Sequence, residues 1–298
     1  MGCGKMKGRR MDTAMVEEYC AWLRENEKSP GTIERYRRFL LNFTLFSDGR
    51  TVCRQTAAQW KERIRQIMAP VTVNGAVAAV NGFFRYKGWG DCVMKFFRIG
   101  RRIFCPEQKE LEREEYERMV RRAREEGDLR TALVMETIAS TGIRVSELKY
   151  ITVEALNQGA VNVECKGRIR TILCTEELKK KLLSYTERQG IGAGPVFVTR
   201  SGAPLDRSNI WRSMKRIGAL AGVAAEKIFP HNLRHLFARI YYSQEKDLSR
   251  LADILGHSSV NTTRIYVMES GKNHLKQLEK MDMLVDDDGI PLLLYLRE

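Results

Sequence analysis

The chain has 298 residues, 43% of them hydrophobic, with a formal net charge of +14 and an isoelectric point near 9.6. This length suits two domains of ordinary size, each with its own hydrophobic core. The longest purely apolar stretch, residues 290–296, is far too short to span a membrane. Seven scattered cysteines lack zinc-site spacing, and without a recognisable secretory leader they predict reduced thiols in the cytoplasm.

The positive charge is concentrated in the first third of the chain. Residues 1–105 carry 20 of the 51 lysines and arginines but only 9 of the 37 acidic residues, whereas the remainder is nearly balanced. Excess charge of this kind can simply favour solubility. Its segregation instead predicts a polyanion-binding part joined to a more neutral body.

Four short helices are predicted in the first ninety residues. Asp12 can cap the first, and Ser29 followed by Pro30 can open the second. Apolar residues at helical spacing predict two more at residues 56–68 and 73–87. The first ninety residues therefore predict a small all-α domain.

The predicted domain boundaries follow from this pattern. Residues 1–92 form the helical domain, residues 93–108 lack periodicity and read as a linker, and residues 109–298 form the second domain. Basic residues of the first domain and the linker are the candidate contacts to a nucleic acid. These are Arg35, Arg37, Arg38, Arg85, Lys87, Arg101 and Arg102.

The second domain is predicted to be mostly helical with one small sheet. Residues 161–165 and 170–174 alternate as strands do, and a Lys-Gly-Arg turn joins them. The predicted helices are residues 110–126, 129–140, 176–188, 206–221, 231–243 and 248–255. A tail, about residues 271–298, adds a polar helix at 272–281 and the apolar end. The fold class is mainly α with a small antiparallel β-sheet.

Four residues that carry chemistry cluster near the end of the chain. His231, Arg234, His257 and Tyr266 lie within 36 residues, and Arg144 lies upstream in a Thr-Gly-Ile-Arg segment. Phosphoryl transfer needs such a set: a nucleophile, fixed cations around the developing negative charge and a proton shuttle. Each residue alone is most simply a packing or surface residue, and the argument rests on their combination.

Each member of the set has a chemical role that suits it. The phenol of Tyr266 can attack a phosphodiester and conserve its bond energy in a covalent intermediate. Arg144 and Arg234 can hold phosphate oxygens through planar, permanently charged guanidinium groups. His231 lies one helical turn before Arg234 and can accept the tyrosine proton or orient the phenol. His257 can donate a hydrogen bond to a phosphate oxygen.

Four segments together, residues 141–148, 166–170, 230–237 and 255–266, resemble the tyrosine recombinases, and in particular their small two-domain, Xer-like members. The resemblance implies a SAM-like core-binding domain that grips duplex DNA and an α+β catalytic domain of the DNA breaking-rejoining type. It implies site-specific recombination through a 3′-phosphotyrosine and a Holliday junction, with no metal or cofactor.

The resemblance also assigns further residues. Lys166, in the hairpin turn, corresponds to the lysine that protonates the leaving 5′ oxygen, although an exposed hairpin lysine is a competing interpretation. Arg168 and Arg170 are phosphate clamps or rivals for that role. Glu147 corresponds to an acidic residue that supports Arg144 or a histidine, with a surface carboxylate as the alternative. His235 is a supporting neighbour of the motif.

The resemblance implies an assembly as well. The tail would dock into a neighbouring protomer and form a cyclic tetramer on two DNA sites, with packing on its own domain as the alternative. Nucleoid association follows from the DNA substrate. Chromosome-dimer resolution and mobile-element movement both fit. Rival functions are relaxation of DNA by a type IB topoisomerase and a catalytically silent DNA-binding regulator.

Overall fold

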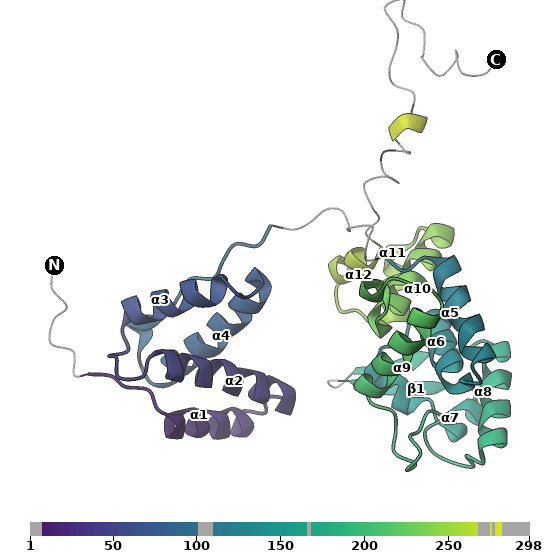
Figure 1. The fold of residues 1–298 in the computed structure, drawn as a ribbon, viewed down its shortest axis with the longest axis horizontal. Helices are drawn as coiled ribbons and strands as arrows, with labels where there is room; N and C mark the ends of the chain where they lie inside the picture. The colour runs from purple at the N-terminus through teal and green to yellow at the C-terminus, as the bar shows by residue number, and fades with distance from the viewer. Residues whose placement is uncertain (1–7, 101–109, 166–167, 268–274, 276–277, 282–298) are drawn as a thin grey trace, which may run out of the picture. The chain divides into compact units, whose positions relative to one another are not determined.

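The computed structural model describes residues 8–100, 110–165, 168–267, 275 and 278–281. The chain folds into two compact units, Met1–Arg101 and Arg102–Glu298. Both units are predominantly helical (Figure 1). Within the described ranges, every helix is too short or too polar to cross a lipid bilayer.

Helices are the only regular secondary structure in the described part of the first unit. It contains α1 (Thr13–Glu25), α2 (Pro30–Phe46), α3 (Arg54–Arg65), α4 (Pro70–Tyr86) and the 3-10 helix η1 (Gly90–Cys92). Asp12 caps α1 by accepting a hydrogen bond from the Met15 amide at 2.8 Å. Pro30 and Pro70 occupy the first turns of α2 and α4, where the missing N–H costs nothing.

Aromatic packing holds the first unit together. Phe43 lies edge-on to Trp60 and Phe84, with ring centroids 5.2 and 5.6 Å away. The fully buried Asn81 on α4 donates to the Met94 carbonyl and accepts from the Met94 amide. This pair of bonds fixes the start of the segment that leaves the first unit.

The second unit contains the only sheet among the described residues. Its elements are α5 (Arg113–Glu125), α6 (Leu129–Thr141), η3 (Val145–Tyr150), α7 (Val153–Gln158), β1 (Val161–Cys165), β2 (Arg168–Ile172), α8 (Glu176–Gln189), α9 (Arg207–Leu220), η4 (Ala225–Lys227), α10 (Pro230–Glu245), α11 (Leu248–Leu255) and α12 (Val260–Tyr266). The strands pair antiparallel, with Cys165 opposite Arg168 next to the turn.

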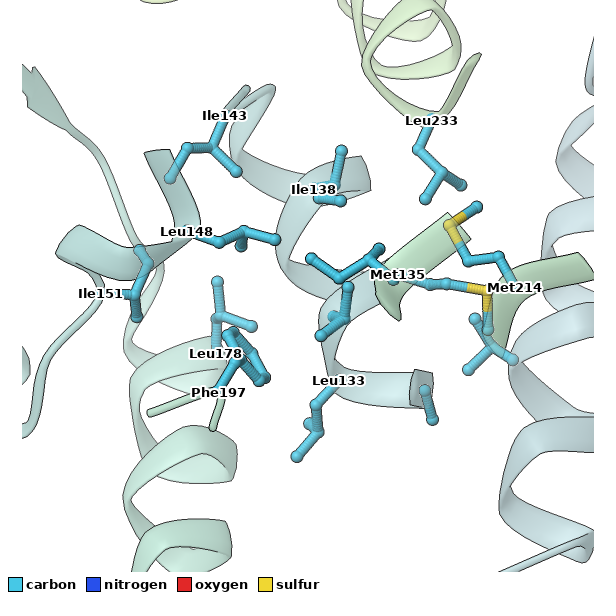
Figure 2. Packing of buried hydrophobic residues seen from close by; sticks show 14 of the residues in the cluster. Leu133, Met135, Ile138, Ile143, Leu148, Ile151, Leu178, Phe197, Met214 and Leu233 are labelled. Carbon is cyan, nitrogen blue, oxygen red and sulfur yellow. The ribbon is translucent and has the colours of Figure 1, made fainter. Parts of the chain in front are cut away.

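Helix α6 forms the centre of the second unit. It packs against α5 and α10, and its buried Leu133, Met135 and Ile138 lie in the core with Leu233 of α10 (Figure 2). Gly142 ends α6 with a φ of +63°, and a Cβ there would lie within 2.9 Å of side chains on α10 and α11. Glycine therefore lets the chain after α6 run against both helices, where the candidate site forms.

The predicted fold class, mainly α with a small antiparallel sheet, is confirmed. The second strand spans residues 168–172 rather than the predicted 170–174, and its pairing with β1 fixes this register. Helices α7 and α12 and the 3-10 segments were not predicted, since one or two turns leave too little periodicity to detect. Half of the predicted helix at 272–281, residues 272–274 and 276–277, lies outside the described residues.

Candidate active site

Helix α10 presents three of the predicted residues on one face. His231 lies next to Pro230 at the first turn, and Arg234 and His235 follow three and four residues later. The rings of His231 and His235 meet edge to face at 4.8 Å. Loss of hydration, followed by the charge of Arg234, lowers the pKa of His231, although the residue keeps an exposed surface. This shift favours the neutral form of the His231 ring.

Arg234 is almost completely buried, with 1% of its surface exposed. Its guanidinium donates to the carbonyls of Gly142 and Leu255, the latter at 2.7 Å, and lies 2.9 Å from Nε2 of His257. Its Nε has no acceptor among the described residues. Burial, and then the charge of Arg144, lowers the pKa of Arg234 to about 10, so it stays charged at neutral pH.

Glu147 joins two arginines from different parts of the chain. Its carboxylate accepts from the backbone and the guanidinium of Arg144, at 3.0 and 2.8 Å, and from the guanidinium of Arg170 on β2. Arg144 also reaches the carbonyl of Gly256 at 3.3 Å, and Arg170 reaches that of Ile254 at 3.0 Å. The predicted support of Arg144 by Glu147 is therefore compatible with the geometry.

The two arginines differ in their access to solvent. The side chain of Arg144 is 36% exposed, whereas that of Arg170 is 12% exposed. Arg170 is committed to Glu147 and to the end of α11, so the geometry favours a structural role for it. Its predicted contact with DNA stays a prediction.

The turn after α11 carries His257. Gly256 ends the helix with a φ of +63°, and the side chain of Arg170 lies where its Cβ would be. The imidazole of His257 is held at both nitrogens. Its Nε2 faces Arg234, and its Nδ1 lies 2.9 Å from the hydroxyl of Thr263. Burial, and then the charge of Arg234, lowers the pKa of His257 to about 4.

Tyr266 is the last residue of α12 and is 9% exposed. Its ring stacks on His235 at 4.3 Å and lies 4.7 Å from His257 and 5.1 Å from His231. The guanidinium carbon of Arg234 lies 5.5 Å from the ring centre. The phenol of Tyr266 is thus surrounded by His231, Arg234 and His235 of α10 and by His257. His235 is its closest ring neighbour.

Several predicted residues cannot be placed. Lys166, Arg101 and Arg102 lie outside the described residues, as does the side chain of Arg168, whose backbone pairs with Cys165. Their predicted roles stay predictions.

The basic side chains of the first unit fall into two groups. Arg37 and Lys87 form ion pairs at 2.6 Å with Glu17 and Glu18 of α1. Exposed pairs of this kind contribute about 0–1 kcal/mol, so a DNA phosphate can replace the carboxylate at small cost. The remaining predicted contacts in the described part of this unit are exposed: Arg35, Arg38 and Arg85.

Sequence reasoning missed Thr263 and the two carbonyls that accept hydrogen bonds from Arg234. Thr263 lies one helical turn before Tyr266, and this spacing would have been the available signal. The carbonyls of Gly142 and Leu255 leave no mark in the sequence, since every residue has one.

Replacing Gly256 with alanine is expected to lower the free energy of unfolding by about 2–3 kcal/mol, because a positive φ and a blocked Cβ position add together. Gly222→Ala is the matched control: its φ is +66°, but nothing lies within 4 Å of the Cβ position. We expect this control to lose about 1 kcal/mol in urea unfolding. Equal losses in the two variants would contradict the close contact with Arg170.

Acid is expected to destabilise the site. Burial lowers the pKa of His235 to about 4, like that of His257, whereas an unfolded histidine titrates near 6.5. The native state therefore binds fewer protons, so this contribution is full above about pH 6.5 and is lost as the pH falls toward 4. Urea unfolding at pH 7 and 5 should show a smaller loss in His235→Phe than in the wild type. An equal loss of unfolding free energy in His235→Phe and the wild type would show that His235 does not cause the acid destabilisation.

Comparisons with known proteins identify relatives of the chain. Residues 109–272 match the model of the phage integrase family. The tyrosine recombinase XerA of Pyrococcus furiosus is 26% identical over 287 residues, covering 94% of this chain and 98% of the relative. XerD of Xanthomonas campestris is 34% identical over 165 residues, about half of each chain.

Solved structures share the fold. XerH bound to palindromic difH substrate, a post-cleavage complex, superposes with a TM-score of 0.71 at 21% identity, covering 90% of this chain and 84% of that one. A lambda integrase tetramer bound to a Holliday junction gives a TM-score of 0.70 at 18% identity, covering 85% and 76%.

Proposed function

The chain belongs to the phage integrase family, the tyrosine recombinases, and from this membership we propose a site-specific DNA recombinase whose nucleophile is Tyr266. One observation carries the assignment of the nucleophile. The phenol ring is enclosed by three histidines and lies 5.5 Å from the guanidinium carbon of Arg234, although these residues come from α10, α12 and the turn after α11.

The two arginines receive the scissile phosphate. Arg144 is partly exposed and holds Gly256 only through a 3.3 Å contact, so this donor can turn to a phosphate oxygen. Arg234 is positioned beneath the phenol and keeps its charge at neutral pH. Guanidinium donors aimed at the developing charge stabilise the transition state. Glu147 keeps Arg144 in place while this happens.

The covalent step transfers two protons, one to His231 and one from Lys166, and replaces one P–O bond with another. The Tyr266 oxygen attacks phosphorus while neutral His231 accepts the phenolic proton. The bond to the 5′ oxygen of the next nucleotide breaks, and Lys166 protonates that oxygen. The product is a 3′-phosphotyrosine, which stores the bond energy until a partner strand's 5′ hydroxyl reverses the step.

Strand exchange places further demands on the assembly. Double-stranded DNA with a short core site is the substrate, and the helical part, residues 1–92, clamps it while residues 109–298 carry the chemistry. Two DNA sites and four protomers pass through a Holliday junction, a state in which lambda integrase has been solved. The tail, about residues 271–298, docks into the neighbouring protomer. The protein acts on DNA in the cytoplasm, at the nucleoid.

Trapping covalent complexes on DNA tests the proposed function. The full chain is incubated with sheared DNA from its source, denatured in detergent, and the attached fragments are sequenced. We expect adducts enriched at one short site, joined through the 3′ phosphate. A plasmid carrying two copies of that site should then recombine. Relaxation of supercoils without exchange would point instead to a topoisomerase, and no adduct on any DNA to a silent DNA-binding protein.

A further inference from the structure

Thr263 connects the helix that carries the nucleophile to His257. It is fully buried on α12, one turn before Tyr266, and its hydroxyl lies 2.9 Å from Nδ1 of His257. On the other side of the ring, Nε2 lies 2.9 Å from Arg234. The ring is therefore held at both nitrogens by residues from two different helices.

The identities of these partners fix where the ring carries its proton. A guanidinium has donors only and does not lose its charge, so Nε2 must be the acceptor in its contact with Arg234. The proton of the neutral ring then lies on Nδ1, which donates to the Thr263 hydroxyl. In the DNA-free protein, His257 thus cannot donate from Nε2.

A phosphate oxygen accepts hydrogen bonds but cannot donate them, so His257 must carry a proton on Nε2 to bind one. This becomes possible when Arg234 turns its donor to the phosphate and Nε2 takes up one proton from water. Nδ1 keeps its proton throughout, so it needs an acceptor both in the neutral ring and in the charged ring. The Thr263 hydroxyl supplies that acceptor before and after the change.

We infer that Thr263 is a positioning residue: its hydroxyl holds Nδ1–H of His257, so that the ring gains its second proton at Nε2 when the scissile phosphate arrives. By accepting from Nδ1, Thr263 also favours the charged ring, whereas burial and the nearby cations oppose it. The charged and titratable groups near this histidine are Arg144, Arg170, Arg234, His231 and Tyr266, and Glu147 accepts hydrogen bonds from the first two of these arginines.

The inference rests on the proposed function for its kinetic test. Thr263→Val preserves shape but removes the acceptor, Thr263→Ser restores it, and Thr262→Val makes the same change at an exposed neighbour on α12. We expect single-turnover cleavage of a suicide substrate to fall about tenfold or more in Thr263→Val, as when a supporting partner of a histidine is lost elsewhere. Thr263→Ser and Thr262→Val should stay close to the wild type.

The pH profile separates positioning from packing. Without the acceptor, the charged ring is less stable, so the alkaline limb of the cleavage profile should move to lower pH in Thr263→Val and not in Thr263→Ser. An unshifted limb, equal defects in the valine and serine variants, or wild-type cleavage by Thr263→Val would each overturn the inference.

A spectroscopic measurement is independent of activity. In the DNA-free wild type, nitrogen-15 NMR of the imidazole should place the proton of His257 on Nδ1. A proton on Nε2 instead would overturn the inference without requiring any variant to fold. Failure of the wild type to form a DNA adduct would overturn the proposed function and leave this measurement unaffected.

Discussion

Replacing Tyr266 with phenylalanine is expected to abolish the covalent DNA adduct, lowering its rate of formation by a factor on the order of 10⁴ or more, because no other atom supplies the nucleophile. Affinity for DNA should change little, since contacts to the phosphate backbone dominate it. The ring contacts with His235 and His257 are retained by phenylalanine, so the fold should persist. Gel shift and denaturing gels measure the two properties separately.

Tyr241→Phe is the matched control. Tyr241 packs on the same small cluster of α10, α11 and α12 but is not among the groups that surround the phenol. This variant should form the adduct at the wild-type rate. An adduct formed by Tyr266→Phe, or lost in Tyr241→Phe, would remove the nucleophile assignment.

Replacing Arg234 with lysine is expected to lower cleavage by roughly 10²–10³-fold, since one ammonium cannot reproduce a guanidinium that serves several acceptors at once. The same change should cost about 1–3 kcal/mol of unfolding free energy, because the carbonyls of Gly142 and Leu255 lose buried donors. Suicide-substrate kinetics and urea unfolding provide the two measurements.

Arg239→Lys separates these effects. Arg239 lies on the same helix and donates to the Leu111 carbonyl at 2.6 Å, without contacting the phenol. We expect some loss of stability and cleavage close to that of the wild type. If both lysine variants lost cleavage in proportion to their loss of stability, the reduced activity would reflect unfolding rather than the absence of the Arg234 guanidinium.

The sequence indicated which residues lie together more readily than it indicated the contacts between them. His231 and Arg234 share a helix, so their spacing predicted a common face, and the structure places Tyr266 against both. No local pattern could predict that Glu147 holds Arg170 as well as Arg144, because that contact joins a 3-10 helix to a strand. Pairing between distant segments is decided by tertiary packing.

The fold could be predicted to a similar degree. Long helices such as α2 and α10 are evident from periodic apolar residues and from proline at the first turn. The short α12 carries Tyr266 and has only seven residues, too few to show a period. Its helical form follows from packing on α11 and α10. The contact of Thr263 with His257 depends on this helix and was hidden for the same reason.

Identification of the residue bonded to DNA tests the central claim most directly. Trypsin should cleave after Arg264 and Lys272, giving a peptide, residues 265–272, that contains Tyr266 and no other tyrosine. After digestion of the trapped DNA to a short remnant, mass spectrometry should find the remaining nucleotide on this peptide, attached to the phenolic oxygen. A nucleotide attached to any other residue would contradict the account.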